Sequence, residues 1–199
     1  MKLFLEKVYS KMSGDYLLVT NLFEDQTDRF ANPLVTKSLI QKGIDKSANV
    51  QLILNADEPI SASLKSNKET IYFGINNVYD EAGNLIEYEK KSFKCPICEK
   101  EMEYSKNFYS QLGYYSCSCG YSRQKPKYLA DIKLYKNHIE IILNEETLEV
   151  PLVGLFNAYN ALGAIVLAKE LLNGNKKPNV FKEGVCSKDE RLKDGFYNE

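Results

Sequence analysis

The chain has 199 residues, of which 44% are hydrophobic and 27% charged, and its formal net charge is −1. This length suits one α/β domain with an insertion, or a domain plus a small module. The near-neutral charge gives no electrostatic reason to expect a nucleic-acid or membrane-surface partner. No apolar run approaches the length of a membrane span, and the N-terminus lacks the long apolar stretch of a signal peptide, so we expect a cytoplasmic protein.

The first half of the chain alternates helix-like and strand-like segments. Residues 1–13 and 33–46 carry apolar side chains at helical spacing, which predicts two helices. Residues 15–20, 50–56 and 70–75 are short apolar runs with the length of buried strands. Such alternation predicts an α/β domain with a mostly parallel sheet and flanking helices.

The residue composition and pattern change from residue 83 onward. Residues 83–125 alternate tyrosines and charges around four cysteines and predict a small β-rich insertion. The next segment, 128–154, predicts antiparallel strands with a turn near Asn144-Glu145 and with the single histidine, His138, in a strand. Residues 155–172 predict a strong helix. We therefore expect an α/β domain of 1–82 and 126–175, an inserted ribbon of 83–125 and a weakly ordered tail of 176–199.

Polar side chains follow the predicted strands, at the place where ligands bind in parallel sheets. These candidates for a site are Asn21, Asp25, Asp28, Asn55 and Asp57. Polar residues after strands also form ordinary turns, so their position alone leaves both interpretations open.

Two cysteine pairs provide the strongest chemical pattern. Cys95-Pro-Ile-Cys98 is a tight turn that places two thiolates toward one ion, and Cys117-Ser-Cys119 followed by Gly120 is a shortened form of it. Four cysteines complete the tetrahedral shell of a structural zinc ion and leave no position for water or substrate. The alternatives are a disulfide pair or a redox dithiol, but a redox pair usually lacks a second pair nearby.

Several segments together resemble one family. They are "NLFEDQTDRF" (21–30), "NADEP" (55–59), the cysteine ribbon, and "PLVGLFNAYNALGA" (151–164), in this order. They are similar to segments of the MurT-type subunits of lipid II isoglutaminyl synthase, which are relatives of the Mur peptide ligases. A four-cysteine ribbon between the second loop and the last helix is the specific combination, since ordinary Mur ligases lack it. The resemblance covers about residues 15–170.

The resemblance implies an activity and partners. MurT-type subunits use ATP and magnesium to activate the D-glutamate α-carboxyl of lipid II, and a GatD-type glutamine amidotransferase supplies ammonia to form isoglutamine. Residues near the nucleotide or substrate would be Asn21, Asp25, Asp28, Arg29, Asn55, Asp57, Asn157 and Asn160. The zinc ligands would be Cys95, Cys98, Cys117 and Cys119.

The chain departs from the family at several points. It contains no G-x-x-x-x-G-K-[ST] phosphate-binding loop, and Glu24 stands where the family has arginine. The C-terminal ligase domain of the family has no counterpart in the sequence. We therefore expect a truncated or degenerate relative that does not turn over ATP by itself. The alternative is a non-catalytic zinc-ribbon scaffold or binding module derived from the same fold.

Overall fold

The structure is a computed structural model, and it describes residues 15–22, 32–47, 49–89 and 92–173. The chain divides into two compact units, Met1–Leu167 and Ala168–Glu199. The second unit is described only over the last residues of one helix. The predicted helix over 1–13, the predicted tail over 176–199, and the candidates Asp25, Asp28 and Arg29 lie outside the described residues.

In the described part of the first unit, six strands form one sheet in the order β1-β2-β3-β7-β8-β9. The strands are β1 (Tyr16–Val19), β2 (Gln51–Asn55), β3 (Ile71–Tyr79), β7 (Tyr128–Leu134), β8 (Ile139–Leu143) and β9 (Glu146–Val150). The first four are mutually parallel, and β8 and β9 are antiparallel additions. This confirms the prediction of a mostly parallel α/β sheet.

Helix α2 (Pro33–Asp45) begins as its sequence predicts. Asn32 caps it, since its side-chain oxygen accepts a hydrogen bond from the backbone N–H of Leu34 at 2.9 Å. Pro33 occupies the first helical position, where no backbone N–H is needed. After β2 the chain forms a short 3₁₀ helix, η1 (Ser61–Ser63), before it enters β3.

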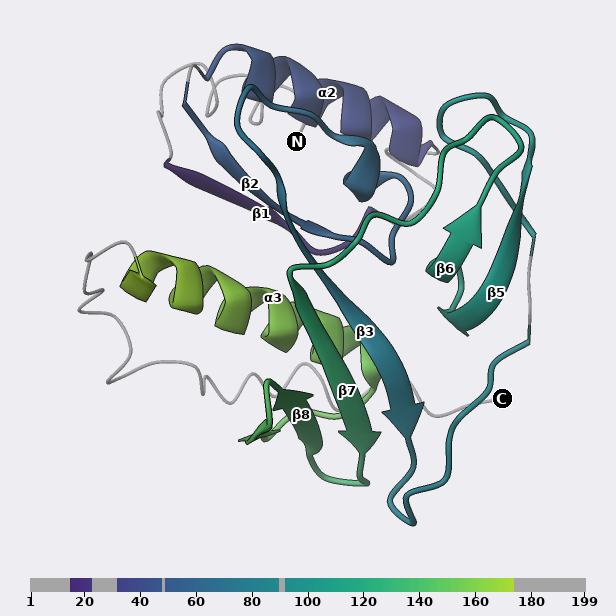
Figure 1. The fold of residues 1–199 in the computed structure, drawn as a ribbon, viewed down its shortest axis with the longest axis vertical. Coiled ribbons are helices and arrows are strands. Elements are labelled where there is room, and N and C mark those ends of the chain that lie inside the picture. Colours follow the sequence, from purple (N-terminus) through teal and green to yellow (C-terminus); the bar gives the residue numbers. More distant parts are fainter. Residues whose placement is uncertain (1–14, 23–31, 48, 90–91, 174–199) are drawn as a thin grey trace. The chain divides into compact units, whose positions relative to one another are not determined.

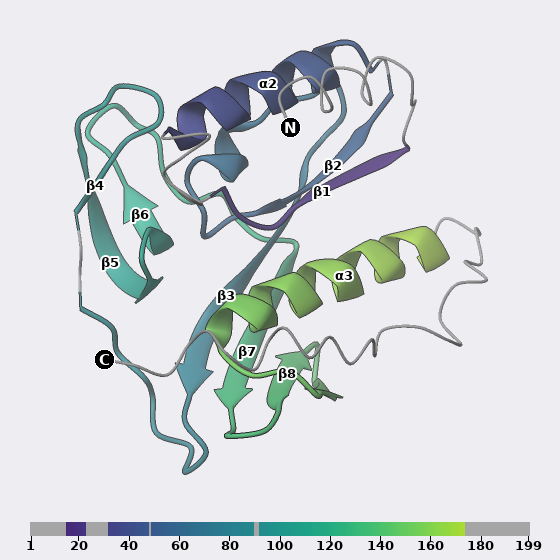
Figure 2. The same ribbon diagram turned by 180° about the vertical axis from the view of Figure 1, so that it is seen from behind.

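The two α-helices of the described residues cover opposite faces of the sheet (Figures 1 and 2). Strand β2 shows why, because its side chains alternate between the two helices. Leu52 and Leu54 pack with Ile40 and Ile44 of α2 in one apolar cluster. Ile53, which points to the other face, belongs to the cluster on the side of the second helix. The full burial of β2 explains its nearly continuous apolar sequence.

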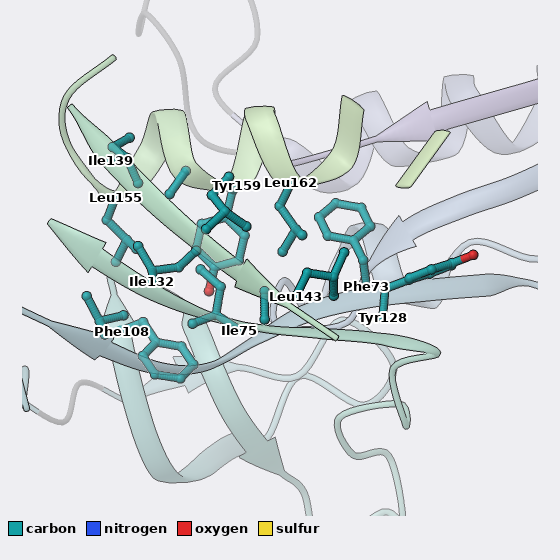
Figure 3. Close-up of a cluster of buried hydrophobic side chains, with 14 of the residues drawn as sticks. Phe73, Ile75, Phe108, Tyr128, Ile132, Ile139, Leu143, Leu155, Tyr159 and Leu162 are labelled. Carbon is teal, nitrogen blue, oxygen red and sulfur yellow. The ribbon is translucent and has the colours of Figure 1, made fainter. Parts of the chain in front are cut away.

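The second helix, α3 (Leu155–Asn173), forms the larger core with the sheet. Figure 3 shows Tyr159 and Leu162 projecting from α3 toward Ile75 and Phe73 of strand β3, and all four side chains are buried. The expectation that no apolar run approaches the length of a membrane span was wrong for Leu155–Leu172, which is long and apolar enough to cross one by length and composition alone. Its inward residues fill the core of the first unit, which is the ordinary role of such a helix in a globular domain.

Between β3 and β7 the chain forms a second, three-stranded sheet, called the ribbon here. Its strands are β4 (Phe93–Lys94), β5 (Glu101–Tyr109) and β6 (Leu112–Ser116), in that order and antiparallel. The ribbon has a small apolar cluster of its own, which includes Cys95, Met102 and Tyr104. Phe108 and Leu112 instead join the core beneath α3, so the ribbon shares part of its apolar surface with the main sheet.

The antiparallel strands predicted over 128–154 are confirmed as β7, β8 and β9, and β7 is in addition parallel to β3, because the ribbon returns the chain to the end at which β3 begins. Two details differ from the sequence-based expectations. Strand β3 continues to Tyr79 through an irregular register between Ile75 and Asn77. His138 lies in the turn between β7 and β8 and not in a strand, and its ring stacks on Tyr135.

The turn between β8 and β9 follows the prediction at Asn144-Glu145. Both residues have positive φ, 52° and 68°. Two such residues form the type of tight turn that matches the twist of a β-hairpin. Asparagine tolerates this conformation well, and glutamate does so less readily.

Candidate functional site: a four-cysteine cluster beside the strand ends

The four cysteines of the ribbon come together as the sequence predicts. The ligand atoms of Cys95, Cys98, Cys117 and Cys119 all lie within 4.8 Å of one another. The sulfur of Cys95 is 3.8 Å from that of Cys119, and the sulfur of Cys98 is 3.5 Å from that of Cys117. A zinc ion at ~2.3 Å from four tetrahedral sulfurs requires sulfur–sulfur separations of about 3.8 Å. The donor set therefore fits a structural zinc ion, and all four thiols are free of disulfides.

The two cysteine turns have the backbone that such a site needs. In the first, the N–H of Glu99 donates to the carbonyl of Cys95 at 2.9 Å, and Glu99 has φ of 62°. In the second, Gly120 donates to the carbonyl of Cys117 at 2.9 Å with φ of 89°. The permissive backbone expected of Gly120 is therefore used.

The pKa values of three of the clustered thiols are shifted in opposite directions, since those of Cys95 and Cys98 are raised and that of Cys117 is lowered. A hydrogen bond from the backbone of Cys119 lowers the pKa of Cys117 to about 7. A lower pKa increases the thiolate fraction at neutral pH, and the thiolate is the form that binds metal. Among the described residues, these cysteines form the one group of three or more His, Cys, Asp or Glu side chains close enough to share an ion.

The polar residues after β1 and β2 meet at one edge of the sheet. The side-chain amide of Asn55 donates to the carbonyl of Thr20 at 3.0 Å and lies 3.4 Å from the side-chain oxygen of Asn21. The side-chain nitrogen of Asn21 is buried and has no hydrogen-bond partner among the described residues. Of the predicted candidates, Asn21 and Asn55 are thus neighbours at the carboxyl ends of adjacent parallel strands.

Asp57 is enclosed. Its side chain is 0% exposed, and its carboxylate accepts three hydrogen bonds, from Arg123 Nε at 2.6 Å, the Ile75 N–H at 2.7 Å and Tyr159 Oη at 2.9 Å. Burial raises the pKa of Asp57, and the guanidinium of Arg123 opposes that rise. This carboxylate joins the loop after β2 to the ribbon, to β3 and to α3, a structural role that the sequence analysis did not predict.

Glu58 is buried beside Asp57 but is bonded only through neutral donors among the described residues. Its carboxylate accepts hydrogen bonds from the backbone N–H groups of Ile60 at 3.0 Å and Ser61 at 2.6 Å, and from Gln111 at 3.0 Å. Burial raises the pKa of Glu58. Both carboxylates of this loop are therefore buried, and each accepts three hydrogen bonds from protein donors.

The two asparagines of α3 have different surroundings. Asn157 lies in the first turn, and its side-chain amide donates to the carbonyl of Val153 at 2.8 Å. Asn160 is partly buried and lies one turn before Gly163. A Cβ atom on Gly163 would lie 3.1 Å from the methyl group of Thr20, so the helix passes close to the end of β1 at this point.

Three residues that shape this region were absent from the sequence-based candidates. Arg123 and Gln111 belong to the ribbon, and Tyr159 belongs to α3. Tyr159 lies within the segment "PLVGLFNAYNALGA", which resembles the family. That resemblance was the signal in the sequence that could have pointed to Tyr159 as a partner of Asp57. Gln111 and Arg123 lie in the segment "YSQLGYYSCSCGYSR" (109–123) of the cysteine ribbon, which resembles the family, but their partners lie 53 and 66 residues away in the chain, so the segment alone does not identify the contacts.

Comparisons with known proteins point in one direction. No protein-family model matches the chain. The chain is 30% identical over 183 residues to the MurT subunit of lipid II isoglutaminyl synthase from Staphylococcus aureus, a match that covers 89% of this chain and 40% of that subunit. With the corresponding subunit from Streptococcus pneumoniae it shares 29% identity over 170 residues, covering 84% and 38%.

A solved structure of a peptide ligase has a fold similar to that of this chain. The pseudomurein peptide ligase type C from Methanothermus fervidus superposes with a TM-score of 0.63 at 25% identity, covering 90% of this chain and 36% of that protein. The chain thus spans about two fifths of the length of the curated relatives that it matches.

Proposed function

This chain is a relative of the MurT subunits of lipid II isoglutaminyl synthase, and we propose that it supplies a central-domain part of that ATP-dependent amidation. The reaction would convert the D-glutamate α-carboxyl of lipid II into isoglutamine in peptidoglycan synthesis. ATP would activate the carboxylate as an acyl phosphate, and a GatD-type glutamine amidotransferase would supply ammonia. Such a protein would work in the cytoplasm.

One observation supports this proposal most directly. Asn21 and Asn55 come from two segments that resemble the family's nucleotide-proximal loops. They lie at the carboxyl ends of adjacent parallel strands, with Asn55 Nδ2 3.4 Å from Asn21 Oδ1. Open α/β sheets bind their ligands at this edge. Asn21 also has a side-chain donor without a protein partner in the described residues, which a ligand oxygen could accept.

In this proposal the cysteine cluster holds zinc and takes no part in the chemistry, since four thiolates leave no open coordination position. The predicted nucleotide role of Asn157 and Asn160 remains a proposal, as do those of Asp25, Asp28 and Arg29. The proposal assigns no metal ligand to Asp57 or Glu58, because both carboxylates are buried and each already accepts three hydrogen bonds from the protein.

A second candidate is a non-catalytic scaffold built on the same fold. The enclosed state of Asp57 and Glu58 favours it, because both carboxylates are buried and each already accepts three hydrogen bonds from protein donors.

Nucleotide binding separates the two candidates. We would titrate the 199-residue chain with a fluorescent ATP analogue and magnesium, and repeat the titration with Asn21→Ala. The amidation proposal expects saturable binding that Asn21→Ala weakens while the melting temperature stays within a few degrees. Asn137→Ala, in the exposed turn before β8, is the matched control. No binding by the native chain, with zinc bound and the fold intact, would favour the scaffold.

The expected inactivity of the chain alone has a separate test. Steady ATP turnover by the purified chain, without a partner or lipid II, would refute it. Retention of a GatD-type amidotransferase on the immobilised chain would support the proposed partnership.

A further inference from the structure

We propose that the metal in the four-cysteine cluster sets the conformation of the loop after β2, so that loss of metal releases this loop. The post-β2 loop is defined here as residues 55–60. The proposal concerns how the ribbon holds the loop and does not require that the chain bind ATP.

The first connection runs from the second cysteine turn through Tyr121. The backbone N–H of Cys117 donates to the carbonyl of Tyr121 at 2.8 Å and closes the turn. Tyr121 then donates its hydroxyl hydrogen to the carbonyl of Pro59 at 2.6 Å. Only one residue separates Cys119 from Tyr121, so a change in the cysteine turn reaches the loop through a very short path.

The second connection comes from the β5–β6 turn of the ribbon. Gln111 donates to the carboxylate of Glu58 at 3.0 Å and to the carbonyl of Leu22 at 3.1 Å. Two residues later, Gly113 donates its backbone N–H to the carbonyl of Asp57 at 2.9 Å. The ribbon therefore bonds here both to the post-β2 loop and to Leu22, which follows β1.

The third connection is Arg123. Its backbone N–H donates to Tyr115 of β6 at 2.9 Å, and its guanidinium lies over the ring of Tyr114 with Cζ 3.8 Å from the ring centroid. The same guanidinium pairs with Asp57. Asp57, Glu58 and Pro59 are thus each bonded to the ribbon by at least one hydrogen bond.

The ribbon depends on metal for the geometry of these contacts. Its own buried cluster is small, with Cys95, Met102, Tyr104 and Tyr115 as its buried members. A core of this size does not hold a three-stranded sheet by itself, and in such modules metal binding supplies the folding energy. Without the ion, the cysteine turns lose their constraint, and the bonds from Tyr121 and Gln111 to the loop weaken with them. Because such coupling is reciprocal, a perturbed loop contact must also weaken metal retention.

Hydrogen–deuterium exchange on the full chain tests this inference. We would compare the zinc-loaded protein with the same protein after treatment with a chelator and a thiol reductant. The amides of residues 56–63 should exchange faster by about tenfold or more, because several hydrogen bonds are lost and each contributes a factor of roughly 2 to 10. The amides of the β8–β9 hairpin, 139–150, serve as the internal control and should not change. Faster exchange in the ribbon without a change in 56–63 would overturn the proposal.

A point variant covers the case in which metal removal unfolds the whole chain. Tyr121→Phe removes the bond to Pro59 but keeps the ring, and native mass spectrometry would verify that zinc is still bound. The variant should show faster exchange at 58–63 in its zinc-loaded form and a several-fold weaker zinc affinity in equilibrium competition with a chromogenic chelator. Tyr109→Phe, an exposed tyrosine of the same ribbon, is the matched control. Equal exchange and equal zinc affinity in the two variants would refute the coupling, whatever the outcome of the nucleotide titration.

Discussion

The ion pair between Arg123 and Asp57 allows a sharp test of how the ribbon stabilises the main sheet. Arg123→Met removes the cation but keeps an unbranched stem that can still pack on Tyr114. Asp57 stays fully buried and keeps its bonds from Ile75 and Tyr159, so the carboxylate loses its compensating charge without gaining water.

The size of the effect follows from this burial. The side chain of Asp57 is 0% exposed and that of Arg123 is 10% exposed, so solvent screens the pair weakly. Breaking a buried pair by removing one partner costs about 3–5 kcal/mol, whereas an exposed pair contributes roughly 0–1 kcal/mol. Against a typical total of about 5–15 kcal/mol, the variant should be severely destabilised. Adding Asp57→Asn should return part of this loss, since no unpaired charge then remains buried.

Urea denaturation of the zinc-loaded proteins would measure these differences. Lys100→Met, a neutralised exposed lysine of the ribbon, is the control and should stay within about 0.5 kcal/mol of the native chain. Native mass spectrometry would verify that each variant retains zinc. A loss below about 1 kcal/mol for Arg123→Met, or a double variant less stable than the single one, would refute this account of the buried pair.

Three further predictions concern single residues. Burial raises the pKa of Glu58 in the folded state. The folded chain therefore keeps a proton that the unfolded chain releases near pH 4. The free energy of unfolding should for this reason fall as the pH rises from about 4 through the folded pKa. Glu58→Gln should flatten the unfolding free energy against pH in this window, and equal slopes would contradict the assignment. Glu145→Gly should raise the unfolding free energy by about 1 kcal/mol, because Glu145 has φ of 68°; Glu145→Ala, the control, should give no gain. Gly74→Ala should cost about 1–3 kcal/mol in denaturation, since its Cβ would lie 2.7 Å from Arg123 Nη2 and 2.9 Å from Asp57 Oδ1; a neutral result would show that the pair can move.

Local patterns in the sequence predicted the elements and the metal cluster. Strand β2 and helix α2 follow from apolar spacing and from Asn32-Pro33 at the helix start, because these signals act within a few residues. The cysteine pairs were equally clear, since two short turns contain all four ligands.

The sequence did not reveal which distant strands and side chains contact one another. The run 128–134 has the alternation of a half-buried strand, and this alternation is compatible with either a parallel or an antiparallel neighbour. Similarly, a loop with Asp57 and Glu58 reads as a polar turn, and only the packing of Arg123 and Gln111 shows that both side chains point inward. The tertiary partner decides whether such a carboxylate serves a ligand or the fold.

The position of the ribbon between β3 and β7 has a consequence for how the chain folds. Parallel neighbours cannot be joined by a tight hairpin, and a crossover helix usually makes the connection. Here the crossover is a three-stranded sheet with a four-cysteine cluster that fits a zinc ion. An ion bound early would shorten the free chain between β3 and β7 and so lower the entropy cost of closing that loop. The same ion that stabilises the finished protein would then also speed its assembly, and a refolding experiment with zinc added before or after dilution from urea would measure this kinetic advantage.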